Sequence, residues 1–293
     1  MSGWGVNSEY APLASVLLYR PEASIGNHPD PAAILHNAPI DHAGLMREFD
    51  TIIVTFEDLG IVVNLIEGTP LSSNLDFRFN MMYCRDLFLM TPFGAIVANM
   101  SNTIRSAEQL YATRSLQALG CPILHTVSDT GRFEGADALW LDDTTLLIGV
   151  GNRTNREGYA QVACVLHSYG IACIPVPSCQ TRTQHLLGSM QIVDRNLALV
   201  RNGIIDPELA IVLKRHGVTL VSIPECPEVL RRQAANIVTI APRTVIMTSA
   251  CPDTKKTYRA AGLTIAAELE LTQLIAGAGG LACATGIVAR SMT

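Results

Sequence analysis

The segment Phe133-Glu134-Gly135-Ala136-Asp137 places two acids and a glycine directly before an apolar stretch over residues 138–150. Asp142-Asp143 interrupts that stretch, and a polar pair between two apolar runs is typical of a hairpin turn. We therefore predict two paired strands, followed by a helix over residues 157–168 and a further strand over residues 171–176. The result is a ββαβ unit with a period of about 50 residues.

The same order of patterns recurs along the chain. Hairpin turns are expected near residues 91–94, 142–143, 194–196 and 242–243. A helical pattern and then a short apolar strand follow the other turns as well, with helices over 105–119, 207–216 and 253–261 and strands over 122–127, 218–223 and 263–267. Recurrence at a fixed period is the sequence signature of a repeat architecture, and four copies are present.

A fifth unit forms if the last expected strand, residues 283–289, pairs with the first, residues 15–19. Residues 44–59 then supply its helix and residues 61–66 its outer strand. The chain closes on itself, and we predict one α/β domain over residues 1–293: a five-bladed α/β propeller of ββαβ repeats with pseudo-fivefold symmetry.

Composition limits the partners. The chain is 48% hydrophobic and 16% charged, which is enough apolar material for a large core. A net charge of −5 gives no general attraction to nucleic acid phosphates, so nucleic acid is not an expected partner. No apolar run is long enough to cross a bilayer, and the first residues lack a secretory signal pattern, so we expect a cytoplasmic protein without a membrane partner.

The eight cysteines are scattered through the sequence. Cys121, Cys164 and Cys173 stand among apolar residues, which favours buried free thiols over a disulfide framework. Neither a Cys-x-x-Cys nor a His-x-x-x-His pair occurs, so the spacing offers no four-ligand metal cage. We expect no metal and no other cofactor.

Residues at equivalent places in successive propeller units converge on the common axis. The places before each inner strand hold Asp86, then Glu134 and Asp137, then His185, then Asn236 and finally Cys283. Each residue alone is typical of core packing or of a structural ion pair, and it is the shared register that favours a site. The glycine-rich residues 277–280 allow close backbone approach beside Cys283.

These residues resemble the guanidine-modifying enzymes, the pentein superfamily, which comprises dimethylarginine dimethylaminohydrolases, arginine deiminases and amidinotransferases on a five-bladed α/β propeller. The resemblance covers nearly the whole chain. It rests on Arg85-Asp86, residues 133–137, Asn152-Arg-Thr-Asn155, His185-Leu186, Ala234-Ala-Asn236 and a cysteine near the C-terminus.

The resemblance implies a hydrolase that acts on arginine or an Nω-methylated arginine and yields citrulline. Cys283 would attack the guanidinium carbon as a thiolate, which a bound cationic substrate stabilises. His185 would protonate the departing nitrogen and then activate water. Glu134 would bind the guanidinium or hold His185 protonated.

The resemblance also implies a set of substrate-binding residues. Asp86 would bind the guanidinium of the substrate. Arg105 and Arg153 would bind its α-carboxylate, because the planar guanidinium of an arginine side chain can donate two parallel hydrogen bonds to a carboxylate. Asn80 and Asn236 are candidate polar supports. Asp137 either contacts substrate or caps local backbone.

Several alternatives stay open. Arginine deiminases and amidinotransferases usually carry an aspartate where this chain has Leu187, which favours a dimethylarginine-type substrate. Arg85-Asp86 and Asn80 look more like the deiminases, so the preferred guanidine is open. An arginine dihydrolase that gives ornithine, an amidinotransferase, a ribosome-binding scaffold of the same fold, and a homo-oligomer are the remaining possibilities.

Overall fold

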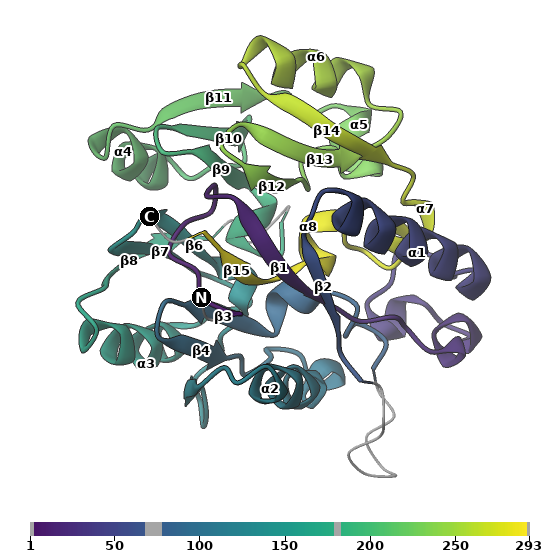
Figure 1. Cartoon of the computed structure of the whole chain (residues 1–293), viewed down its shortest axis with the longest axis horizontal. Helices are drawn as coiled ribbons and strands as arrows, with labels where there is room; N and C mark the ends of the chain where they lie inside the picture. The colour runs from purple at the N-terminus through teal and green to yellow at the C-terminus, as the bar shows by residue number, and fades with distance from the viewer. Residues whose placement is uncertain (1–2, 68–77, 179–182, 292–293) are drawn as a thin grey trace.

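The computed structural model describes residues 3–67, 78–178 and 183–291. Five three-stranded sheets surround a central axis, with helices on the outside of the ring (Figure 1). The sheets, in order from inner to outer strand, are β15 (Gly286–Arg290), β1 (Leu13–Leu18) and β2 (Val62–Leu65); β3 (Phe88–Thr91), β4 (Gly94–Val97) and β5 (Ile123–Thr126); β6 (Ala138–Asp142), β7 (Thr145–Val150) and β8 (Ala172–Pro177); β9 (Met190–Asp194), β10 (Leu197–Arg201) and β11 (Thr219–Ile223); β12 (Val238–Ala241), β13 (Thr244–Thr248) and β14 (Thr264–Leu269). The predicted five-bladed α/β propeller is confirmed.

Every blade has the same connectivity. The inner strand pairs antiparallel with the middle strand, and a helix then returns the chain to an outer strand parallel to the middle one. The five connecting helices are α1 (His42–Asp58), α2 (Glu108–Ala118), α3 (Arg156–His167), α4 (Pro207–Arg215) and α6 (Pro252–Ala260). Asp41, Asn155 and Asp206 cap three of them by accepting hydrogen bonds from first-turn amides.

The ring closes through the first and last strands, as predicted. Leu13 of β1 lies opposite Arg290 of β15, and Leu17 lies opposite Gly286. Val16, Leu17 and Leu18 are fully buried. The closing blade is therefore part of the apolar core.

A short turn leads into each inner strand, and these turns carry the chemistry. They are η3 (Cys84–Asp86), η5 (Gly135–Asp137), η6 (Leu186–Gly188), the residues 233–236 before β12, and α8 (Leu281–Ala284). The turn η3 touches both α8 and η5, η5 touches η6, and Asn236 is hydrogen-bonded to α8. The convergence that the repeat predicts is thus present.

Two predicted boundaries were wrong. Cys283 was expected to begin the last strand but lies in α8, because Asn236 Oδ1 accepts hydrogen bonds from the Ala282 and Cys283 amides and holds them in a helical turn. Arg105 was expected in a helix but ends the turn η4 (Thr103–Arg105), which the Asn102 side chain caps.

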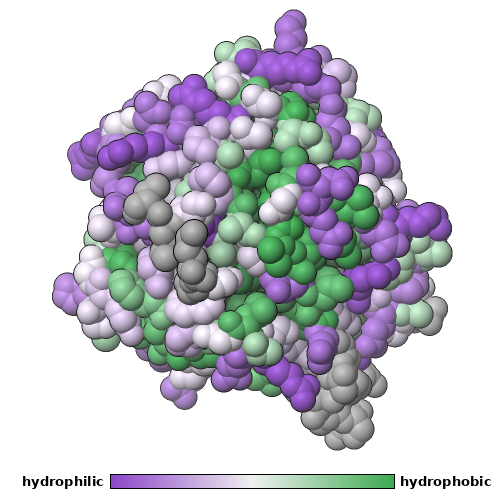
Figure 2. Space-filling view, viewed as in Figure 1, coloured by the Kyte–Doolittle hydropathy of each residue, from purple (hydrophilic) through white to green (hydrophobic). Residues whose placement is uncertain are grey.

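The surface holds a further correction. Cys164 is exposed on α3, not buried as predicted, because it lies on the face of this amphipathic helix that points away from the sheets. Apolar residues gather on one face of the molecule near β2 and α1 (Figure 2), where Val54, Val62 and Leu65 are exposed. Among the described residues, no helix has the length and apolar character needed to cross a membrane.

Candidate active site

A cavity of about 230 Å³ opens where the lead-in turns converge. Its walls include Asp86, His185, Asn236 and Cys283, each from a different blade, and the backbone of residues 277–279. Glu134 is fully buried behind this wall and reaches the cavity through His185. The thiol, imidazole, amide and carboxylate of the predicted site therefore come together.

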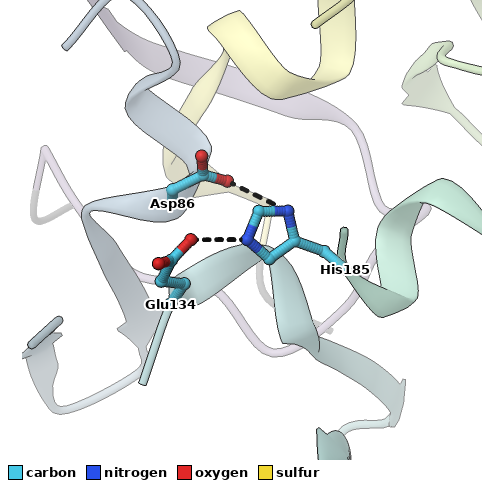
Figure 3. A group of neighbouring side chains, drawn as sticks. All are labelled: Asp86, Glu134 and His185. Carbon is cyan, nitrogen blue, oxygen red and sulfur yellow. Dashed lines mark hydrogen bonds and ion pairs between the residues drawn. The ribbon is translucent and has the colours of Figure 1, made fainter. Parts of the chain in front are cut away.

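The imidazole of His185 lies between two carboxylates (Figure 3). Its Nε2 is 2.6 Å from Glu134 Oε2, and its Nδ1 is 3.8 Å from Asp86 Oδ1. All three side chains are at most 8% exposed. Since Nε2 is committed to Glu134, Nδ1 is the nitrogen that faces the remaining space.

Charge keeps this imidazole protonated. Burial alone would lower the pKa of His185, but Asp86 and the hydrogen bond to Glu134 overcome that effect and raise the pKa to about 9. For Glu134, burial would raise the pKa, and the hydrogen bond and positive charge of His185, with Arg105 and Arg153, instead hold it below its usual range. The pair is thus an imidazolium and a carboxylate at neutral pH.

Asp86, Glu134 and His185 also have the spacing of a metal site, since their ligand atoms lie within 4.8 Å of one another. A metal binds neutral imidazole, whereas His185 holds its proton up to about pH 9. Arg153 Nη1, at 3.6 Å from Glu134 Oε1, adds further positive charge. A metal ion here would have to displace the His185 proton and to bind close to the positive charge of Arg153.

Asp86 presents an open oxygen. Its Oδ2 accepts a 2.6 Å hydrogen bond from Arg105 Nη1, whereas its Oδ1 is buried with no hydrogen-bond partner among the described residues. A buried acceptor without a partner costs about 1–3 kcal/mol. A cation that brings N–H donors into the cavity would remove that cost.

Arg105 lies in the cavity wall, but other groups already occupy its guanidinium. Besides Asp86, it donates to Glu108 Oε2 at 2.7 Å and to the Asn80 carbonyl at 3.1 Å. Burial raises the pKa of Glu108 to about 7, although Arg105 opposes the shift. This arrangement differs from the expected contact with a substrate carboxylate, and it makes Arg105 a support for Asp86.

Asn236 holds the nucleophile candidate. Its Nδ2 donates to Cys283 Sγ at 3.0 Å, and its Oδ1 accepts from the Cys283 amide at 3.2 Å. Burial and then the charge of Asp86 raise the pKa of the Cys283 thiol. The thiol is therefore protonated while the cavity is empty, and a bound cation would favour its ionisation.

Of the remaining predicted residues, two line the cavity and one is buried behind its wall. Arg153 lines the cavity, where Nη2 donates to Gln184 Oε1 at 2.5 Å. Asn80 lines it too, with its amide bound to the Ile34 carbonyl. Asp137 is fully buried and accepts from the Leu186 amide at 2.8 Å, so it fixes the backbone beside His185.

Sequence reasoning missed part of the cavity wall. Tyr83, Arg201 and Gln233 all contribute, and Gln233 has a positive φ of 53°. Arg201 forms a two-point ion pair with Glu225, at 2.7 and 2.8 Å. Arg201 directly follows the apolar run Leu-Ala-Leu-Val, and this position could have indicated a buried arginine.

Comparison with known proteins gives a consistent result. The arginine deiminase family model matches residues 74–217. An uncharacterized protein from Aeropyrum pernix is 26% identical over 189 residues, which cover 64% of this chain and 65% of that protein.

Solved structures share the fold over almost the whole chain. Dimethylarginine dimethylaminohydrolase from Pseudomonas aeruginosa, complexed with citrulline, matches with a TM-score of 0.73 and 18% identity, covering 94% of this chain and 98% of that one. An amidinotransferase of saxitoxin biosynthesis from Microseira wollei gives 0.80 and 15%, covering 99% and 98%. The N-terminal domain of a cyanobacterial arginine dihydrolase gives 0.79 and 16%, covering 94% and 97%.

These structural matches agree with the five blades of three strands. The chain therefore has the α/β propeller fold of these structures, and its residues 74–217 match the arginine deiminase family model.

Proposed function

We propose that this protein is a hydrolase that cleaves a C–N bond of the guanidino group of L-arginine or an Nω-methylated arginine. The products are citrulline and ammonia or a methylamine. One observation carries the proposal: Asp86, whose Oδ1 accepts no hydrogen bond from the described residues, lines the same cavity as the Cys283 thiol and the protonated His185. An acceptor for a cation, a nucleophile and an acid are the three groups that this reaction requires.

The first half of the reaction consumes the guanidinium. Substrate N–H groups donate to Asp86 Oδ1, and the incoming positive charge lowers the pKa of Cys283, whose proton leaves to solvent. Sγ then bonds to the guanidinium carbon. His185 Nδ1 gives its proton to the departing nitrogen, the C–N bond breaks, and a thiouronium remains on Cys283.

The second half regenerates the enzyme. Neutral His185 takes a proton from water, and the hydroxide attacks the thiouronium carbon. The hydroxyl of this adduct then loses its proton to solvent, the C–S bond breaks to release citrulline, and the electron pair of that bond returns to Sγ. Glu134, 2.6 Å from Nε2, stabilises each imidazolium state of this cycle.

Leu187 bears on the choice of guanidine. It lines the cavity and is 4% exposed. An apolar side chain here offers no hydrogen bond to an unsubstituted nitrogen and tolerates an N-methyl group, which supports methylated arginine as a substrate beside arginine.

A product assay tests the proposal. Purified protein is expected to release citrulline from arginine or from Nω,Nω-dimethylarginine, measured by chromatography of the reaction mixture. Ornithine as a product would identify an arginine dihydrolase instead. A new guanidino compound, formed only when glycine or lysine is added, would identify an amidinotransferase, and no turnover of any of these guanidines would refute the enzyme assignment.

Arg153 is expected to bind the substrate α-carboxylate, which would displace Gln184 Oε1 from Nη2. Arg153→Gln should raise KM for arginine by about 10–100-fold, the value of one or two charge-assisted hydrogen bonds. Agmatine lacks the carboxylate and serves as the matched control, because its KM should change little. Equal loss with both substrates would show that Arg153 acts only through Glu134.

A further inference from the structure

A second cluster of buried charge lies outside the catalytic cavity. Glu9, Arg85 and Arg290 line a cavity of about 20 Å³, and Glu9 and Arg85 continue into an adjoining one of about 10 Å³. Leu187 lines both the larger of these and the catalytic cavity. The proposed reaction uses none of the three charged residues.

The carboxylate of this cluster is already fully engaged. Arg85 Nη2 donates to both oxygens of Glu9, at 3.1 and 3.0 Å. The Trp140 amide donates to Glu9 Oε1 at 3.1 Å. Glu9 is therefore paired directly with Arg85 and bonds to no second guanidinium among the described residues.

Arg290 forms no direct ion pair with a carboxylate of the described residues, although the charge of Glu9 acts on it through space. It is 5% exposed, and its Nη1 and Nη2 donate to the carbonyls of Ala11 and Thr239 at 2.6 and 2.8 Å. Its Nε is buried with no hydrogen-bond partner in the described part of the chain. Burial lowers the pKa of Arg290 to about 10, which reflects the cost of holding this charge inside the protein.

The balance of charge identifies the missing group. Among the described residues that line these cavities, the charged ones are one carboxylate and two guanidiniums, which leaves one positive charge. A buried charge is normally paired, and two carbonyl dipoles only partly offset a full charge. A water molecule would accept from Nε but would leave the charge in place.

We propose that the cavity beside Arg290 binds a monatomic anion, chloride under cellular conditions, as an acceptor for Nε. The cavity of about 20 Å³ suits a particle little larger than water, so phosphate and sulfate do not fit. The anion stabilises the ring closure, because Arg290 joins β15 to Ala11 of the N-terminal segment and to Thr239 of β12.

Bromide tests the site in two ways. Crystals of the full chain soaked in sodium bromide are expected to show an anomalous peak within hydrogen-bond reach of Arg290 Nε. In solution, once the halide concentration exceeds the dissociation constant of the site, each further tenfold increase in chloride or bromide concentration should raise the melting temperature by about 2 °C. Sodium gluconate, whose anion is too large for the cavity, replaces the halide at constant ionic strength.

Two variants sharpen the measurement. Arg290→Met should abolish the difference between halide and gluconate, whereas Arg232→Met, which removes an exposed ion pair with Glu270, should keep it. If Arg290→Met does not fold, the bromide peak in the unaltered protein decides the question. No anomalous peak at this position, together with equal melting temperatures in halide and gluconate, would overturn the proposal.

Discussion

Replacing Cys283 with serine is expected to reduce turnover of arginine or dimethylarginine by a factor on the order of 10⁴ or more, the usual cost of removing a catalytic nucleophile. Serine keeps the shape of the side chain and can accept the hydrogen bond from Asn236 Nδ2. Its hydroxyl does not ionise near neutral pH, so the guanidinium carbon meets no anionic nucleophile. Steady-state kinetics with citrulline detection measures the loss.

The matched control is Cys164→Ser, which alters an exposed thiol on α3 and should leave the rate unchanged. Calorimetry should show that Cys283→Ser still binds substrate, because Asp86 and Arg153 are intact. Citrulline production at the unaltered rate by a folded Cys283→Ser protein would remove Cys283 from the mechanism.

Glu134→Gln is expected to lower kcat/KM by about 10²–10⁴, the range for a positioned acid–base catalyst. Glutamine keeps a hydrogen bond to His185 Nε2 but removes the negative charge that holds the imidazolium. The departing nitrogen then meets an imidazole that is more often neutral. The kinetic loss should fall on kcat more than on KM, because Glu134 lies behind His185 and does not line the cavity.

The pH profile separates this role from a structural one. In the proposed mechanism the protonated form of His185 is the acid, so the rate should fall as pH rises through about 9 in the unaltered protein. In Glu134→Gln the fall should move to lower pH, yet remain above the ordinary histidine value, because Asp86 still raises the pKa. Glu157→Gln, an exposed change on α3, should shift nothing. An unmoved alkaline limb in Glu134→Gln would contradict the assignment.

The fold was accessible from sequence because its signals are local. Apolar runs around Asp142-Asp143 predicted β6 and β7, and the same pattern marked the other hairpins. The repeat then placed Asp86, Glu134, His185 and Cys283 at one register, since equivalent positions in a ring must face the same axis. No single motif carried this information.

Some contacts were not predicted because the partner residue lies far away in the sequence. Others involve side chains that neither a motif nor the hydrophobic pattern points to. The helical turn at Cys283 requires Asn236, 47 residues earlier in the chain. The engagement of Arg105 by Glu108 follows from where η4 ends and α2 begins. Such pairings follow from the folded geometry, which hydrophobic periodicity does not encode.

The pairing of β1 with β15 also affects biosynthesis. The ribosome makes Arg290 long after its partner Leu13, so the closing sheet cannot form on the nascent chain until the other four blades have been translated. Cys283 lies directly before β15 and reaches its place beside Asn236 at the same late stage. Until β15 has been made, the edge of β1 that it covers stays unpaired, and the thiol site is not assembled.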